Sequence, residues 1–98
     1  MSTYVFKGDE KMAYTILEVR RMYTATLDPV KVGETVAFFR KQKGVSQEVL
    51  SGFADIGRSH LSAIERGERK PTLETLYRIC NALDIKMSTF ILKLEEIL

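Results

Sequence analysis

The sequence contains a single cysteine, Cys80, among its 98 residues, so it cannot form an internal disulfide. A lone cysteine points to a reducing compartment, and its place among apolar residues predicts an inert, buried thiol. No apolar run approaches the roughly 20 residues needed to span a bilayer, and no segment resembles a signal peptide. Together these absences predict a cytoplasmic protein.

The sequence also lacks the constellations that support catalysis. It has no metal-ligand cluster, no glycine-rich phosphate loop and no carboxylate pair that could share one site, because Glu95 and Glu96 are adjacent and point to different helix faces. The one histidine, His60, has no aspartate, serine or cysteine at a spacing that would make it a catalytic base. We therefore expect a protein that is not an enzyme and that uses no cofactor or metal.

The sequence has little net charge, because 15 basic and 13 acidic residues leave an excess of +2. Residues 1–30 are neutral, so the excess lies in residues 31–98, where most basic residues fall in two short runs, 40–43 and 66–70. A pI near 8.8 permits nucleic-acid binding but is weak support by itself. Hydrophobic residues at 45% and charged residues at 29% are ordinary for a globular chain, and this length suits one compact domain.

Helix signals recur through residues 29–98. Asp28 and Pro29 have the capping and first-turn chemistry of a helix start, and Gly44 has that of a helix end. An alternating strand pattern is absent from this region, which predicts an all-α bundle with short connections. The five expected helices are 29–44, 47–54, 58–66, 72–83 and 88–98, the last capped by Ser88.

Residues 1–28 form an N-terminal extension to the domain expected at 29–98. Apolar residues between Met12 and Tyr23 recur at helical spacing, although β-branched residues and an alternation around Tyr14 also permit a strand. We expect a helix there, with the first ten residues loose.

Phe38 is the aromatic residue that this extension is expected to cover. Val36 and Phe39 face the core, which turns Phe38 by roughly 160–200° toward solvent at about 100° per residue. An exposed aromatic beside an apolar segment suggests that one covers the other. We therefore expect residues 12–27 to pack on Phe38.

The stretch from Gln47 to Arg66 has the pattern of a helix-turn-helix. Two helices that cross at roughly 90–120° over a short turn need a small residue at the crossing, which Ser51 supplies. They also need a turn residue that tolerates positive φ, which Asp55 supplies. Ile56 is expected to plug the turn. The apolar anchors expected to hold the two helices are Leu50, Ala54, Leu61 and Ile64.

Five motifs occur in one register between residue 32 and about residue 90: Val32-Gly33-x-x-Val36-x-x-x-Arg40, Gly44-Val-Ser46-Gln47-Glu48-x-Leu50, Leu61-Ser-x-Ile64-Glu65-Arg-Gly67, Pro71-Thr72-x-x-x-Leu76 and Ala82-Leu83. Together they resemble the phage repressor and Cro type (XRE-like) of helix-turn-helix domain. This resemblance implies a five-helix, lambda-repressor-like fold and a sequence-specific DNA-binding transcription regulator. The sequence departs from the family pattern at Ser51, Asp55 and Gly57, and none of these residues is expected to break the fold. Residues 57–61 and the apolar tail are also similar to the controller proteins of restriction–modification systems.

The family resemblance implies that the 58–66 helix enters the major groove, with the side chains that turn away from Leu61 and Ile64 facing the DNA. Arg58 suits a bidentate contact to guanine, and a cation at a helix start is otherwise unfavourable. The expected base contacts are Arg58, Ser59, His60, Ser62 and Ala63. The expected phosphate contacts are Lys43, Ser46, Gln47, Arg66, Arg69 and Lys70.

Arg40 and Glu65 are expected to form a largely buried salt bridge. Arg40 follows Val32 and Val36 at helical spacing and therefore shares their inward face. Glu65 follows Ile64 closely enough to approach it, and the family resemblance places the same pair there. The pair ties the first expected helix to the third.

Apolar residues surround too much of the 88–98 helix for its own domain to bury them all. Phe90, Leu94 and Ile97 can face the domain, whereas the others need a second surface. We expect a homodimer with C2 symmetry and a pseudo-palindromic operator whose half-sites lie ~34 Å apart. The expected dimer interface consists of Ile91, Leu92, Leu94 and Leu98. The alternative left open is an antitoxin-type protein that also binds its operator, with residues 1–28 contacting a small protein partner.

Overall fold

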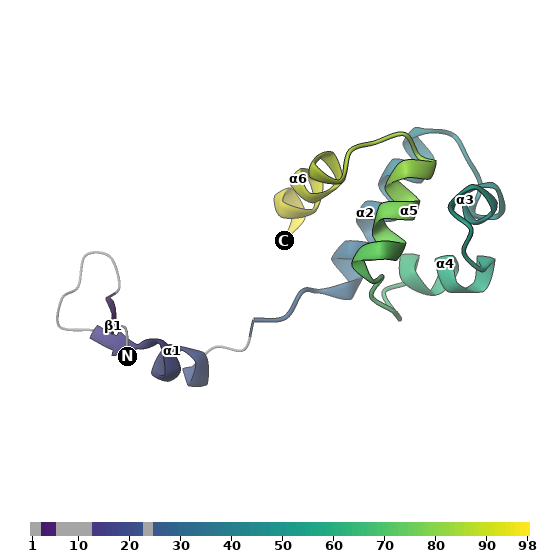
Figure 1. The fold of residues 1–98 in the computed structure, drawn as a ribbon. Helices are drawn as coiled ribbons and strands as arrows, with labels where there is room; N and C mark the ends of the chain where they lie inside the picture. The colour runs from purple at the N-terminus through teal and green to yellow at the C-terminus, as the bar shows by residue number, and fades with distance from the viewer. Residues whose placement is uncertain (1–2, 6–12, 23–24) are drawn as a thin grey trace.

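A computed structural model describes residues 3–5, 13–22 and 25–98 (Figure 1). Five helices pack together into a helical body, which confirms the predicted all-α class for this part of the chain. The helices of this body are α2 (Pro29–Gln42), α3 (Gln47–Ala54), α4 (Arg58–Glu65), α5 (Leu73–Ala82) and α6 (Met87–Ile97). Among the described residues, no helix is both long enough and apolar enough to cross a membrane.

The N-terminal extension contains two short strands and a helix. Strand β1 (Thr3–Val5) pairs antiparallel with β2 (Ala13–Thr15), and helix α1 (Ile16–Met22) follows β2 directly. The Thr15 hydroxyl accepts a hydrogen bond from the Glu18 backbone N–H at 3.2 Å, which caps the start of α1, and it donates one to the Glu18 carboxylate at 3.1 Å. The predicted helix is therefore correct over α1 and wrong over β2, where the structure has the strand that the alternation around Tyr14 also permitted.

Two other expectations for the extension are settled in part. The first ten residues were expected to be loose, yet residues 3–5 form β1. Met12 and Tyr23, which bound the predicted helix, lie outside the described residues.

The described residues of the extension do not cover Phe38. Figure 1 shows β1 and α1 apart from the helical body, joined to α2 through residues 25–28, which are exposed. The Lys93 ammonium of α6 lies 4.4 Å from the centroid of the Phe38 ring instead. A cation over an aromatic face is attracted by the ring quadrupole. Lys93 of α6 therefore contacts the Phe38 ring where residues 12–27 were expected, and Phe38 remains 41% exposed.

The helix starts follow local capping chemistry. The Asp28 carboxylate accepts from the Val30 N–H at 2.9 Å, the Ser46 hydroxyl from the Val49 N–H at 3.1 Å and the Thr72 hydroxyl from the Thr75 N–H at 3.1 Å. Each of these bonds satisfies a backbone donor that the first helical turn leaves free. The predicted starts of α2, α3 and α5 are therefore correct to within a residue.

Helix α6 begins differently from the prediction. Its first residue is Met87, and the N-cap position is held by Lys86, which makes no side-chain cap. Ser88 was expected to be the cap, but it lies inside the first turn. Leu83, Ile85 and Met87 anchor this end of the helix to the core, so packing sets the start that capping was expected to set.

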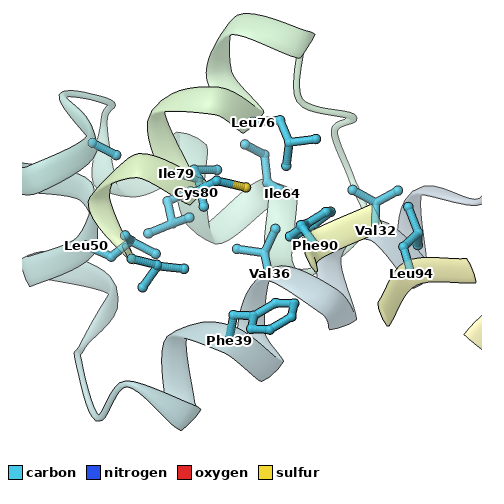
Figure 2. Packing of buried hydrophobic residues seen from close by; sticks show 13 residues of the cluster. Val32, Val36, Phe39, Leu50, Ile64, Leu76, Ile79, Cys80, Phe90 and Leu94 are labelled. Atoms are coloured by element: carbon cyan, nitrogen blue, oxygen red, sulfur yellow. The ribbon is translucent and has the colours of Figure 1, made fainter. Parts of the chain in front are cut away.

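The hydrophobic core joins all five helices of the body (Figure 2). Fully buried side chains come from each of them, and the largest is Phe90 of α6. At roughly 1.5–3 kcal/mol for each buried large apolar side chain, this cluster is the main source of stability. The fully buried apolar residues are Val36, Leu50, Leu61, Ile64, Ile79 and Phe90, and Cys80 is buried among them as predicted.

Candidate nucleic-acid interface

Helices α3 and α4 meet through a three-residue turn. Asp55 has φ 54° and ψ 49°, in the left-handed region that the sequence analysis required at this position. The Ile56 N–H donates to the Ser51 carbonyl at 3.1 Å, which closes the turn back onto α3. Ser51 is buried, and its hydroxyl donates to the Glu48 carbonyl at 2.8 Å. The predicted helix-turn-helix geometry is therefore present.

Helix α4 has one buried face and one open face. Leu61 and Ile64 are fully buried against the body, and the other side chains of α4 are at least partly exposed. Two open surface hollows lie along this outer face and share Ser59. The Gln47 hollow, of about 440 Å³, is lined by Gln47, Arg58, Ser59 and Ser62. The Arg69 hollow, of about 320 Å³, is lined by Ser59, His60, Ala63 and Arg69. The structure thus gathers all five expected base-contacting residues on one face, with two of the expected phosphate contacts beside them.

A buried charge network holds this face in place. The predicted ion pair is present: Arg40 donates through Nε to Glu65 Oε2 at 2.7 Å and through Nη2 to Glu65 Oε1 at 2.9 Å. The hydrogen bonds to Glu65 raise the pKa of Arg40 further above its ordinary value. The third nitrogen, Arg40 Nη1, donates to the Val45 carbonyl at 3.0 Å. Glu65 Oε1 also accepts from Gln47 Nε2 at 3.1 Å. One network therefore joins α2, the loop before α3, the first residue of α3 and the end of α4.

The remaining expected phosphate contacts flank α4. Ser46 is occupied as an N-cap through its oxygen lone pair, which leaves its O–H free to donate. Lys43 ends α2, and Arg69 and Lys70 lie in the loop after α4. All four side chains are exposed, and of these four residues Arg69 alone lines one of the two hollows.

Arg66 is more constrained than expected. It is the C-cap of α4 rather than its last helical residue. Its guanidinium donates to the Ser62 hydroxyl and, at 2.7 Å, to the Glu68 carboxylate. Arg66 holds the pKa of Glu68 below its ordinary value, so Glu68 stays ionised and offsets part of the Arg66 charge. Because this pair is exposed and worth little, Arg66 can exchange Glu68 for a phosphate at small cost.

Two contacts at the motif were missed by the sequence analysis. Arg78 Nη1 of α5 donates to the Asp55 carbonyl at 3.4 Å, so α5 also supports the turn. The Val45 carbonyl is the acceptor for Arg40. The spacing of Glu74 and Arg78 signals an ion pair on α5, but no sequence signal identifies a backbone carbonyl as a partner.

A sequence profile of the helix-turn-helix family matches residues 36–90. The chain belongs to this family.

Individual relatives agree with that assignment. The chain is 34% identical over 65 residues to an uncharacterised HTH-type transcriptional regulator of Sinorhizobium fredii, covering 66% of this chain and 84% of that protein. It is 35% identical over 60 residues to the immunity repressor protein of Bacillus phage phi105, covering 61% of this chain and 42% of the repressor. The chain thus spans less than half of that repressor.

Solved structures of two restriction-modification controller proteins have the same fold. The controller C.AhdI from Aeromonas hydrophila superposes with a TM-score of 0.63 at 34% identity, over 66% of this chain and 98% of the controller. The controller C.Esp1396I superposes with a TM-score of 0.68 at 28% identity, over 74% of this chain and 94% of the controller. The helix-turn-helix protein described here is therefore a DNA-binding transcription regulator of the Cro/C1 type, in a family of regulators rather than enzymes.

The C-terminal helix of this helix-turn-helix protein divides its apolar residues between two faces. Phe90 and Leu94 are buried in the core, whereas Ile91, Leu92 and Leu98 are exposed by 38%, 65% and 59%. Leu94 was counted in the expected dimer interface, and that assignment is wrong, because its side chain is part of the core cluster and only 4% exposed. In the described part of the chain, no group of three metal-ligating side chains comes together.

Proposed function

We propose that this regulator binds a pseudo-palindromic operator as a homodimer, with α4 of each copy in the major groove. The observation that carries the proposal is the outer face of α4. Its polar side chains line two open hollows, while Leu61 and Ile64 on the opposite face are fully buried. Because its buried face is packed firmly against the body, α4 can present its outer face to base edges with little loss of conformational entropy.

The residues of α4 differ in what they can read. Arg58, at the first position, suits a bidentate contact to O6 and N7 of guanine. Ser59 and Ser62 can donate to or accept from several bases, and His60 can do either with its two ring nitrogens. Ala63 offers a methyl group that suits the methyl of thymine. This set supports direct readout of a few base pairs in each half-site.

The surrounding groups support a phosphate clamp. Gln47 and Ser46 lie at the start of α3, where the free backbone N–H groups of a first turn attract anions. Lys43, on the loop before α3, and Arg69 and Lys70, on the loop after α4, lie at opposite ends of the motif. Phosphate contacts from these residues set the register of α4 on the duplex without reading sequence.

The exposed face of α6 supports the dimer. Ile91 and Leu92 of α6 and its C-cap residue Leu98 are apolar and exposed. A C2 axis through this face would pair each patch with its own copy. Two copies of α4 would then lie ~34 Å apart, at successive turns of one face of the duplex.

Selection of bound sequences from a random duplex pool tests the proposal. We expect enrichment of an inverted repeat whose half-sites lie one helical turn apart, and protection of both half-sites from cleavage in footprinting. Enrichment of a single, asymmetric site would contradict the homodimer. Failure to enrich any sequence would contradict direct readout by α4.

A small protein partner is the second candidate function, acting alongside operator binding. Ile16 and Leu17 of α1 are half-exposed, on an extension that stands apart from the helical body. A second protein that copurifies in equal amount and is lost when residues 1–27 are deleted would support this function. A homodimer that copurifies alone would contradict it.

A further inference from the structure

The side chain of Gln47 is hydrogen-bonded to the ion pair of Arg40 and Glu65. Its Nε2 donates to Glu65 Oε1 at 3.1 Å, on the same oxygen that accepts from Arg40 Nη2 at 2.9 Å. The Glu65 side chain is only 6% exposed. Gln47 also lines the open hollow that Arg58 and Ser59 line. The Gln47 side chain therefore lies between the Arg40–Glu65 hydrogen-bond network and the open hollow along α4.

The chemistry of the two groups determines which way the Gln47 amide faces. An ionised carboxylate only accepts hydrogen bonds, so the amide must turn its NH₂ group toward Glu65. Arg40 reinforces this, because it donates to both oxygens of Glu65, which therefore act as hydrogen-bond acceptors. One N–H and the Oε1 of Gln47 are then left for a partner outside the network, in the Gln47 hollow.

We propose that Glu65 is a positioning residue for DNA recognition, which acts by holding the Gln47 amide in its binding orientation. The inference rests on the proposed contact between Gln47 and DNA. We call the hydrogen bond between Gln47 and Glu65 the tether. It already restricts the rotamers of Gln47 in the free protein, so Gln47 loses less side-chain entropy when it binds DNA. Glu65 thus increases the affinity for DNA by orienting Gln47, and it stabilises the fold by pairing with Arg40.

Electrostatics alone predicts the opposite effect of Glu65 on binding. DNA is a polyanion, so removing a carboxylate from the binding side of the protein should strengthen binding. Glu48 is the matched control, since it is the neighbour of Gln47 in the first turn of α3 and its side chain is exposed. We expect Glu48→Gln to bind DNA as tightly as the wild type or more tightly. We expect Glu65→Gln to bind about tenfold more weakly, the size expected for a coupled pair in one network.

Glu65→Gln keeps the volume of the side chain but replaces two accepting oxygens by one. In the variant, two nitrogens of Arg40 and the amide of Gln47 meet one oxygen with two lone pairs, beside an NH₂ group that only donates. The variant will be less stable, so binding is measured where unfolding curves show it to be fully folded. Arg40→Met provides a second control, because it lowers stability while leaving both oxygens of Glu65 available to Gln47.

The tether is tested first without DNA, by NMR relaxation of the side-chain amide groups. In the wild type we expect the Gln47 amide to be ordered and that of Gln42, which is exposed near the end of α2, to be mobile. In Glu65→Gln we expect Gln47 to become as mobile as Gln42, whereas in Arg40→Met it stays ordered. A Gln47 amide that is mobile in the wild type, or that stays ordered in Glu65→Gln, would overturn the proposal.

A double-mutant cycle on the selected operator then tests the consequence. If Glu65 acts through Gln47, Glu65→Gln costs about tenfold in the wild type and almost nothing when Gln47 is already replaced by Met. An equal loss in both backgrounds, or no loss in either, would overturn the proposal. Failure of the wild type to select any duplex is a failure of the proposed function alone, and the NMR comparison still decides whether Glu65 positions Gln47.

Discussion

Gly33 of α2 lies directly against the backbone of α4 at Ile64. A Cβ atom built on Gly33 would lie 2.3 Å from the Ile64 carbonyl oxygen and 2.6 Å from that of Glu65. Both neighbours are backbone atoms, which cannot move aside as the end of a side chain can. The absence of a side chain at Gly33 therefore lets α2 approach the end of α4 that carries Glu65.

Gly33→Ala should destabilise the protein even though alanine is the better helix former. The gain in helix propensity is at most about 1 kcal/mol, whereas forcing two helices apart costs about 1–3 kcal/mol or more. We expect a net loss of about 2 kcal/mol and a fall in Tm of roughly 10 °C, measured by thermal unfolding. Gly52→Ala is the matched control, because nothing lies within 4 Å of a Cβ there, and it should raise Tm slightly. A Gly33→Ala protein as stable as the wild type would show that the two helices do not need this approach.

Arg40→Met should lower the free energy of unfolding by about 3–5 kcal/mol, because it leaves the Glu65 carboxylate buried without its cation. Chemical denaturation measures this loss directly. Glu74→Gln is the control: it removes an exposed pair with Arg78 at 3.6 Å, and such pairs contribute at most about 1 kcal/mol. Replacing Arg40 and Glu65 together by apolar residues should recover part of the stability. Equal losses for Arg40→Met and Glu74→Gln would contradict the structural role of the buried pair.

Arg58→Ala should weaken binding to the selected operator by about 1–3 kcal/mol and leave binding to random DNA nearly unchanged, because a base contact carries sequence information. Lys70→Ala should weaken binding to both duplexes alike and reduce the slope of log K against log salt by about one. Titrations of the two duplexes over a range of salt concentrations separate the two effects. If Arg58→Ala weakens both duplexes equally, Arg58 binds phosphate rather than a base.

Ile91→Glu combined with Leu98→Glu should convert a dimer into monomers, because four carboxylates would meet across a C2 axis and lose hydration. Sedimentation at micromolar concentration measures the change. Leu73→Glu is the control: Leu73 is 75% exposed on α5, outside the proposed interface, and the variant should remain a dimer. The interface is wrong if the wild type sediments as a monomer or if the double variant remains a dimer.

Stability should depend on pH through Cys80. Burial raises the pKa of the Cys80 thiol from 9.0 to about 11, so between these values the unfolded chain releases a proton that the folded chain retains. This contribution to the unfolding free energy is present below pH 9 and is lost as the pH rises through about 11. The difference in unfolding free energy between wild type and Cys80→Ala should therefore shrink over this range. A difference that stays constant with pH would contradict the effect.

Features that depend on neighbours in the chain were predictable from the sequence. The caps Asp28, Ser46 and Thr72 act on backbone groups two or three residues away, so a short window contains all the information that they use. The turn at Asp55 is of the same kind. Helical spacing also placed Arg40 on the inward face of its helix, and the family resemblance supplied Glu65 as its partner.

Features that depend on distant segments were decided by the tertiary structure. The sequence of residues 13–15 permits a helix or a strand, and pairing with residues 3–5 makes them a strand. Leu94 and Leu98 look alike in the sequence, but packing on the body buries the first and leaves the second exposed. Gln47 reads as a surface residue, and only the approach of α4 puts a carboxylate within reach of its amide. The reason is physical: capping and helical phase act over one turn, whereas burial and buried polar contacts exist only after the helices have packed.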